Sequence, residues 1–335
     1  MSRKKPSLPF PTLQKQYWKF ELNGGGGVAM QVIYLHVNFF LKFERTVFAD
    51  TNPLFILRSM MGKNLRSMCC ISKKSTCPEC LYNKTCAYSY LFETILPQEN
   101  STLPGRNRGS HPFSFSEKQN FNNKKQIESL DFTLTLFGKA IDYLPYIYAS
   151  FVRAGKDGIF KSRTKFEVTK VCCNGKDILI GENKLNTDFE NYEWKSGENI
   201  FGQNSEQEIL IELRSPLRFK VNGKYTKDFS ASDFMNCLYR RAKTLCHLYG
   251  EYDLNCEEYI PNKSITIEEK SLVWRDTLHY SARQKTAMEL GGSMGSFKMK
   301  GFFSDFEISL LELAKIAGAG KNTNFGLGQL DYWVR

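Results

Sequence analysis

Long apolar segments are missing from this sequence of 335 residues. A helix that spans a bilayer needs about 18 or more apolar residues in a row, and no stretch supplies them. Residues 7–22 also lack the continuous apolar core of a secretory signal peptide. We therefore expect a cytoplasmic protein without a membrane partner.

Histidine is scarce as well, and the chain contains four, namely His36, His111, His247 and His279. Histidine is the side chain whose ordinary pKa lies nearest to neutral pH, so these four are the first candidates for general acid–base chemistry. His36 belongs to a predicted strand, on the face shared with Asn38, and could approach a cleft between domains.

Apolar and aromatic residues are plentiful by comparison. Hydrophobic residues make up 41% of the chain and aromatic residues 14%, against 24% charged. This composition supports buried cores and argues against wholesale disorder. At roughly 150 residues per domain, the length predicts about two domains.

Positive charge is unevenly distributed. The chain has 46 Lys and Arg against 35 Asp and Glu, a formal net charge of +11. The first 127 residues hold 18 basic and 7 acidic residues, whereas the remainder holds 28 of each. A polyanion is therefore the first partner to consider, and the N-terminal part should attract it.

The order of predicted elements repeats once along the chain. A flexible basic segment, residues 1–27, ends in a run of four glycines. The first domain, residues 28–204, should contain a strand, a helix, a strand, a helix and a glycine-started hairpin, at 30–48, 52–68, 129–137, 141–154 and 155–171. A cysteine-rich insertion, about 69–128, interrupts it.

The second domain, residues 205–335, should repeat that order, with elements at 208–220, 232–249, 273–301 and 304–317 and a last strand. Glycine turns follow the second helix of each half, at 155–158 and 318–328. Two tandem ferredoxin-like βαββαβ units, an α+β fold, are the simplest fit.

The glycine-rich segment 318–328 has features that suit phosphate. Its four glycines, Gly318, Gly320, Gly326 and Gly328, allow close backbone approach, and Lys321, Asn322 and Thr323 add donors. It is not a Walker loop, because Asn322 stands where that loop requires Ser or Thr. The alternative is a tight helix-to-strand connection without a ligand.

Ten cysteines in a reducing compartment argue against a disulfide framework. Cys70, Cys77, Cys80 and Cys86 are separated by six, two and five residues. A pair of cysteines two residues apart can present two thiolates to one tetrahedral metal, and the flanking cysteines can close the site. We predict a structural zinc, with an iron–sulfur cluster or unliganded thiols as alternatives, and no catalytic metal.

Several motifs together resemble a known family. They are Ser215–Arg218, the block Tyr280–Gln284 followed by Gly291–Gly295, and the string Gly318–Leu330. In this order they resemble the CRISPR-associated endoribonucleases that process precursor CRISPR RNA, in the repeat-associated mysterious protein superfamily. The resemblance covers about residues 30–335.

The resemblance implies two ferredoxin-like domains and metal-independent cleavage within CRISPR repeats. In that chemistry the 2′-hydroxyl attacks the adjacent phosphate and leaves a 2′,3′-cyclic phosphate and a 5′-hydroxyl. Implied partners are precursor CRISPR RNA and CRISPR effector or adaptation subunits. The alternative is a catalytically silent RNA-binding subunit of an effector complex, which would share the fold and the charge.

The catalytic candidates follow from a strand expected at 277–286. Period two would place His279, Ser281, Arg283 and Lys285 on one face, an acid–base group beside two cations and a hydroxyl. Many family members carry their histidine in or after the first helix of the first domain, and residues 52–86 contain none. His111, on an expected loop beside Arg106 and Arg108, is the second candidate.

RNA contacts are expected from two kinds of residue. The first is the glycine-rich segment 318–328 with Lys321, Asn322 and Thr323. The second is a set of basic side chains, which includes Arg106, Arg108, Arg240 and Arg241.

Overall fold

The computed structural model describes residues 30–49, 52–72, 76–96, 107–117, 125–181, 184–197, 206–252, 258–276, 278–281 and 286–335. The basic segment 1–27 lies outside these residues. None of the helices in the described ranges is both long and apolar enough to cross a bilayer.

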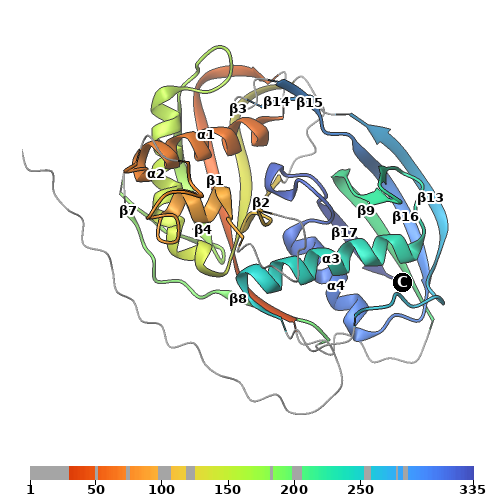
Figure 1. Cartoon of the computed structure of the whole chain (residues 1–335). Coiled ribbons are helices and arrows are strands. Elements are labelled where there is room, and N and C mark those ends of the chain that lie inside the picture. The colour runs from red at the N-terminus through yellow and green to blue at the C-terminus, as the bar shows by residue number, and fades with distance from the viewer. Residues whose placement is uncertain are drawn as a thin grey trace, which may run out of the picture.

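The first half of the chain forms one sheet with two helices on one face (Figure 1). Its elements are β1 (Met30–Ala49), α1 (Pro53–Cys69), β2 (Phe113–Glu117), β3 (Lys125–Phe137), α2 (Leu144–Asp157) and β4 (Phe166–Cys173). The strands lie in the order β2-β3-β1-β4, all antiparallel to their neighbours.

The second half repeats this arrangement. Its elements are β9 (Gln207–Leu217), α3 (Ala231–Tyr249), β13 (Thr266–Arg275), β16 (Gly292–Gly301), α4 (Asp305–Ala317) and β17 (Leu330–Val334). The strand order β13-β16-β9-β17 places the first and third strands of the unit at the centre, as in the first half. The predicted α+β fold of two tandem ferredoxin-like units is confirmed.

Shorter strands and helical turns lie in the connections between these main elements. They are β5 (Lys176–Asp177), β6 (Leu179–Ile180), β7 (Lys184–Leu185), β8 (Tyr192–Lys195), β10 (Lys220–Val221), β11 (Lys224–Tyr225), β12 (Glu251–Tyr252), β14 (Leu278–Ser281), β15 (Thr286–Glu289), a π-helical turn (Ser89–Glu93) and two 3₁₀ turns, Gly138–Tyr143 and Thr323–Phe325.

Strand β1 joins the two halves. Its start pairs with β8 and β12, while the rest pairs with β3 and β4. Because β12 follows α3, the second half of the chain returns a short strand to the first sheet. Trp194 of β8 also donates from Nε1 to the carbonyl of Ser309 in α4, at 2.8 Å. The halves are therefore interlocked around β1.

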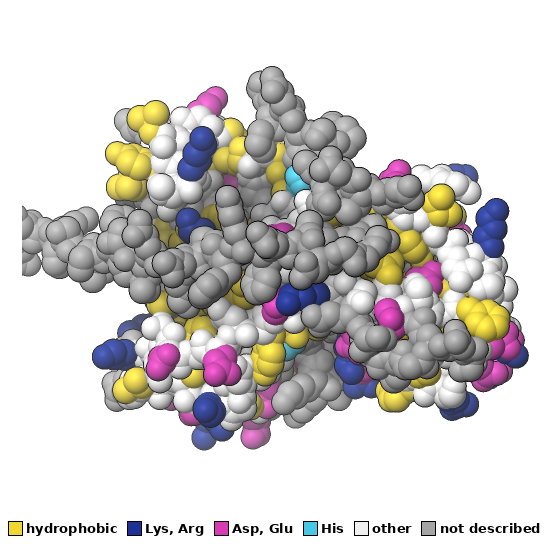
Figure 2. All heavy atoms as spheres, turned by 90° about the horizontal axis from the view of Figure 1, so that it is seen from below, with side chains coloured by type: hydrophobic (Ala, Val, Ile, Leu, Met, Phe, Trp, Pro, Cys, Tyr) yellow, Lys and Arg dark blue, Asp and Glu magenta, His cyan; other side chains and the backbone are white. Residues whose placement is uncertain are grey.

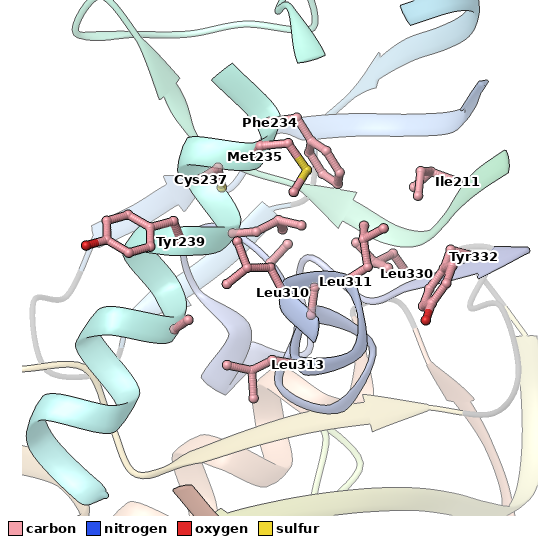
Figure 3. Close-up of a cluster of buried hydrophobic side chains, with 14 of the residues drawn as sticks. Ile211, Phe234, Met235, Cys237, Tyr239, Leu310, Leu311, Leu313, Leu330 and Tyr332 are labelled. Atoms are coloured by element: carbon pink, nitrogen blue, oxygen red, sulfur yellow. The ribbon is translucent and has the colours of Figure 1, made fainter. Parts of the chain in front are cut away.

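Each half has its own apolar core. In the first, Phe39, Phe132 and Phe151 form a trio with ring centroids 5.1–5.4 Å apart. In the second, α3 and α4 pack on the sheet through a larger cluster, shown in Figure 3, which includes Phe234, Leu311 and Leu330. Burial of each large apolar side chain stabilises the fold by about 2 kcal/mol.

Local sequence explains where the main helices begin and end. The side chain of Asn52 accepts from the Leu54 amide, and Pro53 occupies the first turn of α1. Capping boxes start α3 at Ser230 and α4 at Ser304. These interactions lie within four residues, which is why the sequence predicted the helix starts closely.

Two predicted segments need correction. The insertion assigned to about 69–128 includes a strand of the sheet, because β2 occupies 113–117 and pairs with β3. The hairpin expected at 155–171 is not formed, since α2 continues to Asp157 and a single bridge joins Ile159 to Thr164 before β4 begins.

Candidate functional site

The glycine-rich segment 318–328 lies between the two halves. Phe325 and Leu327 form a small apolar cluster with Phe55 of α1 and with Leu290. Just beyond the segment, Gln329 donates from Nε2 to the carbonyl of Phe115 in β2, at 3.0 Å. The segment therefore packs directly against the first half.

Backbone amides of this segment are largely used within the protein. The amide of Ala319 donates to the carbonyl of Gly328 at 2.8 Å. The amides of Gly328 and Lys321 donate to the carbonyls of Pro216 and Arg218, at 3.0 and 2.7 Å. The first of these bonds closes the segment on itself and the other two attach it to the end of β9, so none of the three amides points toward a phosphate. The tight connection considered from the sequence accounts for them.

Close backbone contacts explain why two positions carry glycine. A Cβ on Gly328, where φ is +75°, would lie 1.9 Å from the Ala319 carbonyl oxygen. A Cβ on Gly320, where φ is +73°, would lie 2.5 Å from the Arg218 carbonyl oxygen. No side chain fits at such distances, and positive φ is costly for other residues. These glycines shape the loop.

Arg240 and Arg241, both expected to contact RNA, differ sharply in the structure. Arg240 is exposed, whereas Arg241 is buried. Arg241 donates to the carbonyl of Ala317 at 3.4 Å and to Thr323 Oγ1 at 2.8 Å. Burial lowers the pKa of its guanidinium to about 10. Arg241 and Thr323 therefore bond to each other inside the protein. Of the two arginines, only Arg240 is exposed to solvent.

His111 sits in a cationic contact between α1 and the glycine-rich segment. Arg58 Nη2 lies 3.0 Å from His111 Nε2. With the Asn324 amide turned so that its oxygen faces donors, that oxygen also accepts from Arg58 Nε at 3.0 Å. The Arg58 guanidinium stacks over Phe325, 4.2 Å from the ring centroid.

The surroundings of His111 keep its ring neutral. Burial and then the nearby Arg58, Arg241 and Arg108 lower its pKa to about 3. Its Nδ1 is shielded from solvent. Such a ring is a weak base in a closed contact, so the geometry favours a structural role over the catalytic one considered for His111.

The two arginines expected beside His111 are not equivalent. Arg108 forms a 2.7 Å ion pair with the buried carboxylate of Glu93. That pair gives Arg108 a partner inside the protein, while its side chain stays 43% exposed. Arg106 lies outside the described residues.

The first catalytic candidate, His279, lies on a short hairpin between β13 and β16. Backbone pairing places His279 opposite Met288 and Ser281 opposite Thr286. The single strand expected over 277–286 is therefore wrong, because β14 ends at Ser281 and β15 begins at Thr286. Arg283 and Lys285 fall between them, outside the described residues.

His36, one of the four histidines considered from the sequence, is half-buried on the first sheet. Its Nδ1 lies 3.0 Å from Thr135 Oγ1, and the rings of Tyr34 and Tyr192 are centred 5.1 and 6.2 Å away. Thr135 donates onward to the carbonyl of Ile316 at 3.4 Å, at the end of α4. Burial lowers the pKa of His36, so this ring is neutral near pH 7.

The cysteine segment does not form a metal cage as placed. Among the described residues, no group of three or more His, Cys, Asp or Glu side chains is arranged to hold a metal ion. Burial and then Glu93 raise the pKa of the Cys77 thiol, and Cys86 and Cys70 act in the same direction. The amide of Cys80 donates to the Cys77 carbonyl, at 3.3 Å. Zinc binding stays a prediction.

Surface charge is mixed where it can be seen. On the face in Figure 2, Lys and Arg side chains are dispersed among Asp and Glu rather than gathered into one basic surface.

Two family models match the chain. The model described as "CRISPR-associated endoribonuclease Cas6" matches residues 211–330, which include the hairpin of His279 and the glycine-rich segment. A second model, described as an N-terminal domain, matches residues 31–189. No curated protein matches the sequence.

Solved structures agree with the fold. A chain of a partial Cas6-RT-Cas1–Cas2 complex is similar with a TM-score of 0.50 at 13% identity, over 91% of this chain and 46% of that one. Thermus thermophilus Cas6 gives a TM-score of 0.47 at 13% identity, over 90% of this chain and 99% of that one. The first likeness supports the tandem fold alone. With the match over residues 211–330, the resemblance carried by the motifs is confirmed for that part of the chain, which is similar to the CRISPR-associated endoribonuclease Cas6 family.

Proposed function

We propose that this protein is an endoribonuclease that cleaves precursor CRISPR RNA within its repeats. The observation that carries the proposal is the Cas6 match over residues 211–330, which covers both the hairpin of His279 and the glycine-rich segment. The ordered motifs and the tandem ferredoxin-like units support it.

The proposed reaction needs no metal and no water. The 2′-oxygen of one nucleotide loses its proton to a base and attacks the adjacent phosphorus. The bond to the 5′-oxygen of the next nucleotide breaks, and that oxygen takes up a proton. A 2′,3′-cyclic phosphate and a 5′-hydroxyl result. The protein must align the attacking and leaving oxygens, move the protons and stabilise charge on the phosphoryl oxygens.

His279 is the proposed general base. It lies on β14 inside the matched region, and Ser281 is the last residue of the same strand. Arg283 and Lys285, four and six residues after His279, are proposed to stabilise the phosphoryl oxygens. His111 is set aside from this role because of its closed contact and low pKa.

Partners are proposed from the same family. One similar structure is a Cas6 product complex, and another is the Cas6-RT-Cas1–Cas2 complex. We infer that precursor CRISPR RNA is the substrate and that CRISPR adaptation or effector subunits are candidate protein partners.

The second candidate is a catalytically silent RNA-binding subunit of an effector complex. It shares the fold, and the distant identity of 12–14% to the similar structures leaves it open. A silent subunit would bind the repeat and leave it intact, so activity separates the two.

The test uses the purified protein in excess over its cognate repeat RNA, in the presence of a chelator. We expect cleavage at one position in the repeat, and no cleavage of an RNA with the same composition in shuffled order. Repeat RNA that is bound but stays intact would overturn the enzymatic proposal and favour the silent subunit.

Zinc is a separate proposal for the cysteine segment. The spacing of Cys70, Cys77, Cys80 and Cys86 supports it, whereas their described arrangement does not fit a four-thiolate site without rearrangement. Elemental analysis of the purified protein should give about one zinc per chain for one tetrahedral site. Neither zinc nor iron in a clear fraction of chains would lead us to abandon the proposal.

A further inference from the structure

Three cationic side chains converge on one tyrosine ring beside the glycine-rich segment. The guanidinium carbon of Arg218 lies 3.7 Å from the centroid of Tyr225. The Nζ atoms of Lys220 and Lys321 lie 5.1 and 5.8 Å from the same centroid. We call these four residues the Tyr225 cluster. Of these four residues, only Lys321 was expected from the sequence to contact RNA.

The fold builds the cluster from segments far apart in the chain. Arg218 and Lys220 follow β9, and Lys220 pairs with Tyr225 across the β10–β11 hairpin. The amide of Lys321 donates to the Arg218 carbonyl at 2.7 Å, which brings the glycine-rich segment to the same place. Arg218 also donates from Nη1 to the carbonyl of Gly291 at 2.6 Å, at the base of the hairpin that carries His279. The cluster therefore joins the glycine-rich segment to the base of the hairpin that carries His279.

Charge in the cluster is unbalanced. Within the described ranges, no carboxylate forms a salt bridge with Arg218, Lys220 or Lys321. Two lysines of β16 in the second sheet are neutralised by contrast, since Lys298 pairs with Glu208 and Glu269 and Lys300 pairs with Glu206 and Glu268. Like charges held around one ring repel one another, and a bound anion would relieve that repulsion.

The cluster also has donors that suit an anion. Lys220 and Lys321 are exposed, so their ammonium groups can reach a ligand. The Nε of Arg218 is buried and has no hydrogen-bond partner among the described residues. The ring of Tyr225 holds the guanidinium in place by stacking, which limits the freedom that binding would remove.

We propose that the Tyr225 cluster binds a phosphodiester of the RNA strand and so guides the strand to the hairpin of His279. Ammonium and guanidinium groups contact phosphate oxygens and do not read bases, so this contact is independent of sequence. The inference rests on the proposed function in taking the bound polyanion to be RNA. It adds a site for the backbone, away from the reacting atoms.

The test is the salt dependence of RNA binding. The probe is the cognate repeat synthesised with 2′-O-methyl groups and a fluorescent label, which cannot be cut by the proposed reaction. The variant Lys220→Ala/Lys321→Ala removes two exposed charges, and the control Lys176→Ala/Lys263→Ala removes two exposed charges elsewhere. Fluorescence anisotropy gives the affinity of each protein over a series of salt concentrations.

We expect the cluster variant to bind about tenfold more weakly than the wild type at low salt. The slope of log affinity against log salt should fall by about 1.4, which is near 0.7 for each of two single-strand phosphates that the variant no longer neutralises. The affinity of the control variant should stay within about twofold of the wild-type affinity, because salt screens the interaction between the RNA and surface charges remote from it. Equal reductions of affinity in both variants, or an unchanged slope, would overturn the site.

A parallel assay with unmodified repeat RNA separates this inference from the proposed function. If the wild-type protein cuts the RNA and both variants bind it equally well, the proposed enzymatic function stands and the phosphodiester site at the Tyr225 cluster is rejected. If the wild-type protein leaves the RNA intact and only Lys220→Ala/Lys321→Ala loses affinity, the phosphodiester site stands and the proposed enzymatic function is rejected.

Discussion

The two halves of the molecule end their second helix in the same way and then diverge. Gly158 closes α2 with φ 76° and ψ 151°, and Gly318 closes α4 with φ 73° and ψ 153°. After Gly158, the bridge between Ile159 and Thr164 returns the chain quickly to β4. After Gly318, the chain runs through a longer loop before β17, and that loop packs on α1 and β2.

Comparing the two loops shows which residues are needed to build the fold and which are available for function. A glycine at the end of the helix is needed in both halves, because the backbone there has positive φ. The additional residues of the second loop are not needed to return the chain to the sheet. They contact the first half and contribute Lys321 to the Tyr225 cluster. The second half therefore carries the segments on which the proposed chemistry depends.

The distribution of charge favours the first half, whereas the family match and the longer glycine-rich loop lie in the second half. The basic excess belongs to the first 127 residues, whereas the region matched by the Cas6 model begins at residue 211. Part of the basic charge in the first half is used internally, since Arg108 pairs with Glu93 and Arg58 stacks on Phe325. Net charge alone thus does not locate the site.

The largest effect should come from the second half. Replacing His279 by Ala removes the proposed base and should slow single-turnover cleavage of repeat RNA by about 100-fold or more. The matched variant His247→Ala, at the end of α3, should cleave at close to the wild-type rate. Unchanged cleavage by His279→Ala would move the assignment to another residue, with His36 the next to test.

The two loops can be compared through their glycines. Gly328→Ala should lower the free energy of unfolding by about 3 kcal/mol, because positive φ and a clash with the Ala319 carbonyl both oppose it. Gly158→Ala should cost a similar amount, since its Cβ would meet the Arg163 carbonyl. RNA affinity, measured where both variants are folded, should fall for Gly328→Ala alone.

Gly175 provides the control for backbone strain. Its φ is +76° and no atom lies within 4 Å of the added Cβ. Gly175→Ala should therefore cost only about 1 kcal/mol in urea denaturation. A cost equal to that of Gly328→Ala would show that contacts in the loop matter little.

The adjacent residues Arg240 and Arg241 of α3 test whether buried hydrogen bonds stabilise the glycine-rich segment 318–328. Arg241→Ala should lower the free energy of unfolding by about 2 kcal/mol, because Thr323 and the Ala317 carbonyl would be left without a buried donor. Arg240→Ala should change it by less than about 0.5 kcal/mol, since Arg240 is exposed. Equal effects in thermal or urea unfolding would contradict the internal role of Arg241.

A smaller effect should appear as acid sensitivity at the contact between the halves. The pKa of His111 is about 3 in the folded protein and near 6.5 when the chain unfolds. Between these values the unfolded chain binds an extra proton, so stability contributed by the neutral ring is present above pH 6.5 and is lost as pH falls toward 3. His111→Gln should flatten the decline in urea midpoint over this range. A decline as steep as in the wild type would exclude His111 as its source.

Interactions between near neighbours were the ones that the sequence predicted well. The Asn52 cap and the capping boxes of Ser230 and Ser304 lie within one helical turn, so α1, α3 and α4 began close to where the sequence placed them. Strand alternation likewise predicted β1 and β9. Repetition of this local order was sufficient for the tandem fold.

Long-range pairing was what the sequence could not provide. Strands β8 and β12 are four and two residues long and exist because β1 offers them an edge. Strand β2 lies in a segment that looks polar, yet it pairs with β3. Arg240 and Arg241 are indistinguishable in sequence, and only the packing of α3 decides which one is buried. The Tyr225 cluster joins residues a hundred positions apart for the same reason.

Cleavage of the cognate repeat, with and without its 2′-hydroxyls, tests the central claim most directly. The protein is mixed in excess with unmodified repeat RNA, or with the same RNA carrying 2′-O-methyl groups, both in chelator. The account predicts that the unmodified RNA is cut to a 2′,3′-cyclic phosphate and a 5′-hydroxyl, while the methylated RNA stays intact. Intact unmodified RNA, or cutting of the methylated RNA, would contradict it.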